Sequence, residues 1–283
     1  AMKVGTGLSD FSQKYSDRYM DVGIAEQHAI TYAAGISASN ILPVVAIYST
    51  FIQRAYDQII HDIAIQKLPI IICMDRSGLV GPDGPTHHGI FDIVYLRTIP
   101  NMIVTSPKDG YELNDLLFTA LQVKKMFSIR YGKVATDYNE NYKPKLLNIG
   151  KWEELIKGDD IVILSVGSMV ESSLNVSKKI KINKDVNIGV VNCRFIKPID
   201  ENMLDDIYEQ YDYIYTIEEG AIRGGFGSSI LEYYSNKKKN DKIIRLLGIH
   251  DDFVEHGSRK ELLDLVNLSE DRIYNIIIRE HEE

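Results

Sequence analysis

The chain has 283 residues, 45% of them hydrophobic and 25% charged, and its formal net charge is −8. This length predicts about two domains with real cores, and the acidic balance argues against a general affinity for nucleic acid or an anionic membrane. No run approaches the ~20 apolar residues of a membrane span, and Cys73 and Cys193 are too few for a disulfide framework or a zinc cluster, which indicates a reducing compartment.

Short apolar runs alternate with segments of helical spacing in the first half of the chain. The runs are rich in Ile and Val and bounded by Pro, Gly or charge, which predicts buried strands at 43–47, 69–74, 102–105 and 127–130. Helical spacing covers 24–39, 50–64 and 109–124. Such alternation predicts a parallel sheet with helices on both faces.

Residues 132–150 interrupt this pattern because they are rich in Tyr, Asn and Lys and carry little periodic hydrophobicity. We interpret 136–150 as a linker between a domain at 1–135 and a smaller domain at 151–283. The second domain repeats the alternation, with strands near 161–166, 187–191, 213–217 and 243–247, and helices near 169–179, 201–210, 226–234 and 271–280. The predicted fold class is α/β, with two domains that are each a mostly parallel sheet covered by helices on both faces.

Polar residues gather where predicted strands end and helices begin, which is where open parallel sheets bind ligands. Glu26 lies in the first turn of a helix, where a carboxylate either complements the helix dipole or takes part in chemistry. Phe51 falls at a strand-to-helix corner, where it is either a core residue or a platform for a stacked ring. Arg54 lies on a helix face typical of solvated or ion-paired side chains.

The stretch DRSGLVGPDGPTHHG at 75–89 contains four glycines and two prolines and carries Arg76, Asp83, His87 and His88. A polar loop directly after a buried strand indicates function. A metal site is the competing interpretation, but adjacent histidines rarely point at one ion, and no further ligand stands at a suitable spacing.

A second glycine-rich turn, EEGAIRGGFGS at 218–228, lies between a predicted strand and a predicted helix. Such a turn can cradle a phosphate at the helix N-terminus. Two carboxylates precede it, however, and glycine loops before helices are weak motifs, so a structural turn is the stronger interpretation.

These motifs together resemble the 1-deoxy-D-xylulose-5-phosphate synthases, thiamine-diphosphate enzymes of the transketolase superfamily. The resemblance covers nearly the whole chain and rests on DVGIAEQHAITYAAG, YSTFIQRAYDQ, DRSGLVGPDGPTHHG and EEGAIRGGFGSS. It implies a decarboxylative condensation of pyruvate with glyceraldehyde 3-phosphate for isoprenoid, thiamine and pyridoxal synthesis. It also implies a homodimer in the bacterial cytoplasm or, in a eukaryote, in a plastid-type organelle.

The same resemblance implies roles for individual residues. Glu26 would bond the aminopyrimidine ring of thiamine diphosphate, and His87 would assist proton movement, which makes both catalytic. Phe51 would stack on the pyrimidine, and Tyr48 would lie beside it. The implied substrate-binding residues are Tyr48, Arg54, Arg76, Asp83, His87 and Lys133. Arg76 is the residue suited to a phosphate.

Two departures from the family pattern limit these expectations. The family's R-Y-P-R-G reads RYGKV at 130–134, so Lys133 keeps the charge of an arginine but loses its bidentate fork. The GDG…N motif that holds Mg²⁺ and the diphosphate is absent from this sequence. We therefore expect no metal ligands here and no activity without a diphosphate-binding domain, supplied in cis or as a separate chain.

Two alternatives remain open. Half of a split transketolase would use ketose-phosphate donors in place of pyruvate. A non-catalytic assembly module would need none of the site residues, and the presence of Glu26, Phe51, Arg76 and His87 argues against it.

Overall fold

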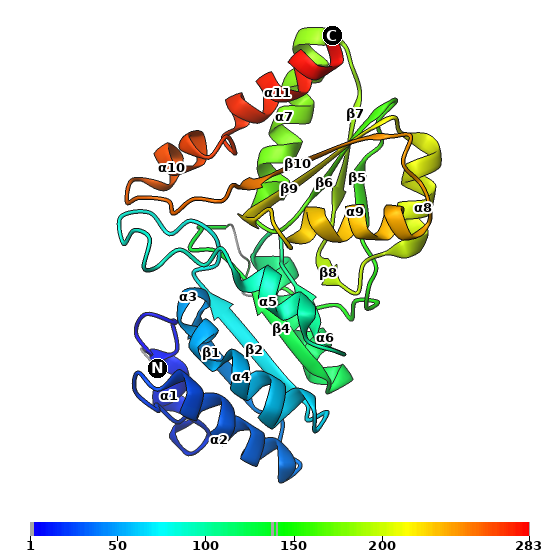
Figure 1. The fold of residues 1–283 in the computed structure, drawn as a ribbon. Coiled ribbons are helices and arrows are strands. Elements are labelled where there is room, and N and C mark those ends of the chain that lie inside the picture. The colour runs from blue at the N-terminus through cyan, green and yellow to red at the C-terminus, as the bar shows by residue number, and fades with distance from the viewer. Residues whose placement is uncertain (1–2, 137–138, 140, 283) are drawn as a thin grey trace.

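The computed structural model describes residues 3–136, 139 and 141–282. Two α/β units lie end to end, with the N-terminus at the side of the lower unit and the C-terminus at the top of the upper unit (Figure 1). Each unit is built on a five-stranded, mostly parallel sheet, so the predicted fold class is confirmed. No helix of the described part of the chain is long and apolar enough to cross a membrane.

The sheet of the N-terminal unit has the order β1-β2-β4-β3-β8. Its strands are β1 (Val44–Tyr48), β2 (Ile70–Asp75), β3 (Ile103–Thr105), β4 (Met126–Arg130) and β8 (Phe195–Lys197). The first four are parallel and match the prediction. β8 was not predicted: it is only three residues long, comes from the second half of the chain and pairs antiparallel with β3. The domain limits at 135 and 151 stay a prediction, and the second half of the chain contributes this strand to the first sheet.

The helices of the N-terminal unit depart from the prediction at three places: the helices at 9–14 and 92–98 were not predicted, and 50–64 is not one continuous α-helix. They are α1 (Ser9–Lys14), α2 (Glu26–Ala38), α3 (Ser49–Ile52), α4 (Tyr56–Gln58), α5 (Asp92–Thr98) and α6 (Gly110–Val123), with 3₁₀ turns η1 (Ser16–Arg18) and η2 (Gln53–Ala55) and a π-helical η3 (Ile59–Ala64). The single helix predicted over 50–64 is therefore wrong. The predicted apolar face of this segment is nevertheless present, because Ile52, Ala55, Ile59 and Ile63 are all fully buried. Over so few residues the spacing does not distinguish an α-helix from tighter and wider turns.

The sheet of the C-terminal unit has the order β10-β9-β6-β7-β5. Its strands are β5 (Glu153–Ile156), β6 (Ile161–Ser165), β7 (Ile188–Asn192), β9 (Tyr213–Ala221) and β10 (Ile243–Ile249). Its helices are α7 (Met169–Lys184), α8 (Glu201–Gln210), α9 (Phe226–Asn236), α10 (Arg259–Leu265) and α11 (Glu270–Glu282). The unpredicted β5 is an antiparallel edge strand. It is only partly buried and carries two glutamates, so it lacks the apolar run that marks the central strands.

The two units share their cores. One apolar cluster extends from α2 and β2 through β4 to β6 and α9. A second cluster lies on the α7 and α11 side of the C-terminal sheet and also contains Leu79 and Ile90, from the segment that follows β2. The N-terminal unit therefore inserts two apolar side chains into the core of its neighbour.

Candidate active site

Three aromatic side chains of the predicted site meet at the carboxyl end of β1. Tyr48 ends that strand, and its ring stacks on Phe51 of α3 with centroids 5.6 Å apart. His87 meets the same Phe51 ring edge-on at 5.4 Å. The turn from β1 directly into α3 brings Tyr48 and Phe51 together, and the loop after β2 adds His87. We call Tyr48, Phe51 and His87 the aromatic cluster.

Glu26 lies beside this cluster as the first residue of α2, and it is only 6% exposed. Arg54 Nη1 lies 3.5 Å from Glu26 Oε1, and the Arg54 guanidinium lies over the Phe51 ring at 5.2 Å. Arg54 is thus ion-paired, one of the two roles expected for its helix face. Arg54 therefore joins a nearly buried carboxylate to a half-buried aromatic ring.

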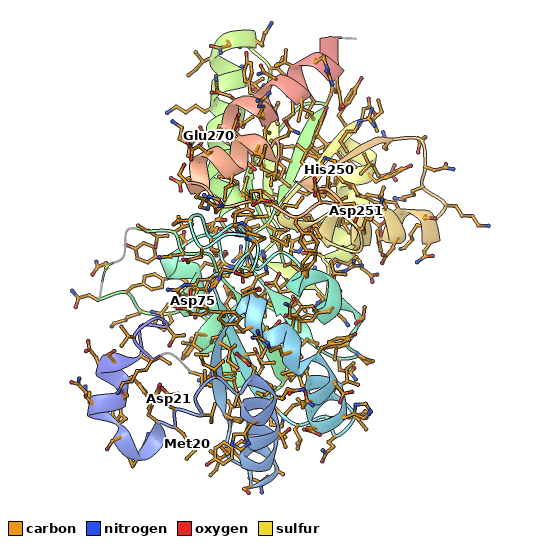
Figure 2. The ribbon with its side chains drawn as sticks, turned by 60° about the vertical axis from the view of Figure 1, so that its left-hand side comes forward. Met20, Asp21, Asp75, His250, Asp251 and Glu270 are labelled. Atoms are coloured by element: carbon orange, nitrogen blue, oxygen red, sulfur yellow. The ribbon has the colours of Figure 1, made fainter. Side chains whose placement is uncertain are left out.

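Arg76 joins the cluster from the other side. Its Nη1 donates to Asp75 Oδ2 at 2.6 Å and to the Gly5 carbonyl at 2.8 Å, and its guanidinium lies 3.9 Å from the centre of the Tyr48 ring. Burial raises the pKa of Asp75, against the opposing charges of Arg76 and Lys133. In Figure 2, Asp75 lies higher in the N-terminal unit than Asp21, toward the C-terminal unit.

The remaining predicted residues, Asp83 and Lys133, are exposed at the edge of this group. Burial raises the pKa of Tyr48, and the charges of Asp75 and Asp83 raise it further while Arg76 opposes them. The negative charge of Asp83 therefore acts on the Tyr48 hydroxyl. The structure brings all eight predicted residues to one edge of the sheet, and their roles stay predictions.

The two adjacent histidines point to different partners. His87 contacts Phe51, whereas His88 is buried, accepts a hydrogen bond from the Val80 amide at Nδ1 and lies 3.2 Å from the Glu255 carbonyl at Nε2. That network assigns the proton to Nε2 of His88. Among the residues that the structure describes, no group of three or more His, Cys, Asp or Glu side chains could hold a metal ion.

A buried ion pair behind the site was not predicted. Arg130 Nε donates to Asp92 Oδ2 at 2.9 Å, and Ser49 Oγ donates to the same oxygen at 2.9 Å. Arg130 Nη2 also donates to the carbonyls of Gly89 and Glu219. The sequence offered one indication of this ion pair. Arg130 is the last residue of an apolar strand, and an arginine buried there needs an acidic partner.

The glycine-rich turn at 218–228 is a structural turn. The amides of Phe226 and Gly227, at the start of α9, both donate to the Glu218 carboxylate at 2.8 Å. A carboxylate of the chain itself therefore holds the place that a phosphate would take. Burial raises the pKa of Glu218 to about 7, although the two amides and the charges of Arg130 and Arg97 oppose the shift.

A cavity of about 160 Å³ lies between the two units. Ser77 and Arg130 line it from the N-terminal unit, and Ser168 and Glu219 line it from the C-terminal unit. None of the eight predicted site residues borders it.

Comparison with known families identifies both halves of the chain. The family described as "Transketolase, pyrimidine binding domain" matches residues 1–137, and "Transketolase, C-terminal domain" matches residues 150–273. A solved structure described as "Split gene transketolase, inactive beta4 tetramer" superimposes with a TM-score of 0.86 at 25% identity, covering 99% of this chain and 88% of that one. The chain belongs to the transketolase family, as a pyrimidine-binding domain followed by a C-terminal domain.

Within that family, the chain is similar to 1-deoxy-D-xylulose-5-phosphate synthases. It is 48% identical to the enzyme of Aquifex aeolicus over 273 residues, and 44% identical to that of Carboxydothermus hydrogenoformans over 274 residues. These alignments cover 96% and 97% of this chain. The chain spans 43% and 44% of the length of these relatives.

Proposed function

We propose that this chain is the pyrimidine-binding and C-terminal part of a 1-deoxy-D-xylulose-5-phosphate synthase. The complete enzyme would join pyruvate to glyceraldehyde 3-phosphate with loss of CO₂, for isoprenoid-precursor synthesis, as a homodimer in the cytoplasm. One observation carries the proposal: Arg54 pairs with the nearly buried Glu26 carboxylate and lies over the half-buried Phe51 ring.

Glu26 and Phe51 fit the aminopyrimidine half of thiamine diphosphate. A carboxylate can bond a ring nitrogen, and an aromatic face can stack on a flat heterocycle. When bound, this cofactor supplies a nucleophilic carbon and an electron sink for the decarboxylation of a 2-oxo acid. Glu26 would exchange a proton through Oε1 or Oε2, and Arg54 would orient the carboxylate. The described residues offer no cluster of metal ligands, so Mg²⁺ and the diphosphate are assigned to a diphosphate-binding domain, in cis or on a separate chain.

Arg76, Lys133 and Asp83 would position the acceptor aldehyde. Within the described part of the chain only Nη1 of Arg76 is engaged, which leaves Nε and Nη2 for a phosphate. Lys133, three residues past the end of the neighbouring strand β4, adds a second positive charge. His87, already in contact with Phe51, would move or hold a proton between the two substrates.

The test combines the purified chain with a diphosphate-binding domain, thiamine diphosphate and Mg²⁺. We expect CO₂ release from pyruvate and its condensation with glyceraldehyde 3-phosphate, with no turnover by the chain alone. A folded Glu26→Gln variant in the same mixture is the matched control. Turnover by the purified chain alone, or wild-type activity in the control, would contradict the assignment.

A second candidate is half of a split transketolase, favoured by the superposition on a split-gene transketolase at a TM-score of 0.86. It would consume a ketose phosphate without releasing CO₂. Supplying pyruvate and a ketose phosphate in parallel assays separates the two reactions. A non-catalytic assembly module would consume neither donor.

A further inference from the structure

The loop 75–89 carries Arg76, Asp83 and His87, yet the C-terminal unit holds much of it in place. Gly78 and Gly89 close the base of the loop by exchanging two backbone hydrogen bonds of 2.8 and 2.9 Å. In Figure 1 the cyan loop after β2 extends to the segment before α10, in the other unit. The amide of Gly257, in that segment, lies 3.5 Å from the Gly81 carbonyl.

Glu219, near the end of β9, makes the shortest of these contacts. Its Oε1 accepts a 2.7 Å hydrogen bond from the Leu79 amide, and the Leu79 side chain is buried in the core of the C-terminal unit. The carboxylate also lies directly against the loop backbone, because a Cβ on Gly78 would be 2.6 Å from Glu219 Cδ. Gly78 has a φ of +80°, so glycine suits this position for conformation as well as for space.

The other carboxylate oxygen of Glu219 is held by the C-terminal unit. Oε2 accepts from Arg259 Nη2 at 2.5 Å and from Ser168 Oγ at 2.9 Å. The Glu219 side chain is only 4% exposed. With both oxygens engaged, the carboxylate links the starts of α7 and α10 to the loop.

We propose that Glu219 is a positioning residue: it places the loop 75–89, and with it Arg76, Asp83 and His87, relative to Tyr48 and Phe51. The consequence for catalysis rests on the proposed function, whereas the physical coupling does not. Glu26 and Phe51 lie on other elements, so Glu219 acts on the acceptor side of the site and leaves the cofactor side in place.

Hydrogen exchange on the present chain tests the coupling. Glu219→Leu removes the acceptor of the Leu79 amide, and we expect that amide to exchange roughly 10–100-fold faster while β2 amides stay protected. Glu219→Gln keeps an acceptor oxygen and should stay much closer to wild type. Glu218→Gln is the matched control, because this equally buried neighbour bonds α9 and not the loop. Unchanged Leu79 exchange in Glu219→Leu, or equal loosening in Glu218→Gln, would overturn the proposal.

A milder variant covers the case in which Glu219→Leu does not fold. Arg259→Gln removes the partner of Oε2 from a partly exposed position and leaves the Leu79 bond itself. We expect a smaller acceleration of Leu79 exchange, and wild-type exchange in this variant would count against the link.

Kinetics with an added diphosphate-binding domain test the consequence. Glu219→Leu should raise the KM for glyceraldehyde 3-phosphate roughly tenfold and leave the KM for pyruvate within about twofold, with recovery in Glu219→Gln. A loosened loop with no difference between the two KM changes would show a merely structural role and overturn the positioning. If the wild-type mixture turns over nothing, the proposed function fails, and the exchange measurement still decides the coupling.

Discussion

Two glycine-rich turns follow the carboxyl ends of strands in this molecule, and they differ in what their residues contact. The loop 75–89 after β2 places Arg76 over the Tyr48 ring and His87 against the Phe51 ring. The turn 218–228 at the end of β9 directs the amides of Phe226 and Gly227 at the buried Glu218 carboxylate. Glycine content is similar in the two, so it does not by itself predict a ligand site.

The two turns differ in how far a carboxylate of the chain occupies their backbone N–H groups. At 218–228 the acid stands at the end of the strand, and a Cβ on Gly225 would collide with it. At 75–89 the carboxylate comes from the other unit. It is that of Glu219, which accepts a hydrogen bond from the Leu79 amide. Arg76, Asp83 and His87 of the same loop remain at the edge of the sheet. Four substitutions test this contrast.

The largest effect is expected at Glu26. In the mixture with a diphosphate-binding domain, Glu26→Gln should lower turnover by roughly 10²–10⁴-fold with the fold intact, because the amide cannot exchange the proton. Circular dichroism and the exchange of the cofactor's C2 proton are the measurements. Asp57→Asn, an exposed acid paired with His61, should leave both unchanged. Wild-type C2 exchange in Glu26→Gln would mean that Glu26 is misassigned.

Arg76→Ala should act on the acceptor. A charge-assisted contact to phosphate corresponds to a KM increase of roughly 10–150-fold for glyceraldehyde 3-phosphate, with little change in pyruvate decarboxylation. Steady-state kinetics with glyceraldehyde 3-phosphate and with unphosphorylated glyceraldehyde separate the two cases. Arg223→Ala, an exposed arginine paired with Asp251, is the control. Equal losses on both acceptors would place the phosphate elsewhere.

Glu218→Gln should change the pH dependence of stability. Burial raises the pKa of Glu218 from 4.5 to about 7, so between these values the native state keeps a proton that the unfolded state has lost. The stability from this group is therefore fully present below pH ~4.5 and is lost as pH rises through 7. In denaturant unfolding, wild type should lose on the order of 3 kcal/mol relative to Glu218→Gln across this window. If the free energy of unfolding changed with pH in the same way in both proteins, the raised pKa of Glu218 would be refuted.

The smallest effect separates contact from strain at two glycines with positive φ. Gly78→Ala at φ +80° would meet the Glu219 carboxylate, whereas Gly23→Ala at φ +69° has nothing within 4 Å. Both should lose about 1–2 kcal/mol to backbone strain, and Gly78→Ala about 1–3 kcal/mol more from overlap. Chemical denaturation measures the difference. Equal destabilisation of the two variants would show that the Glu219 side chain can move away from the added methyl group with no loss of stability.

Local patterns in the sequence determined much of the fold. The eight predicted strands follow from apolar runs of four to six residues, and their parallel arrangement follows from their alternation with helices. The site residues were also accessible from sequence, because Tyr48, Phe51, Arg76 and His87 stand where strands end, and such ends share one edge of a sheet. These features depend on neighbours within a few residues.

Tertiary structure alone decided the features that join distant segments. β8 crosses into the N-terminal sheet, Arg54 pairs with Glu26 from another helical segment, and the Leu79 amide finds Glu219, 140 residues away. Glu218 and Glu219 look alike in sequence, yet successive strand residues point to opposite faces, so one closes α9 and the other holds the loop. Which partner each one meets depends on how the two units pack, because no local periodicity encodes a contact across the junction.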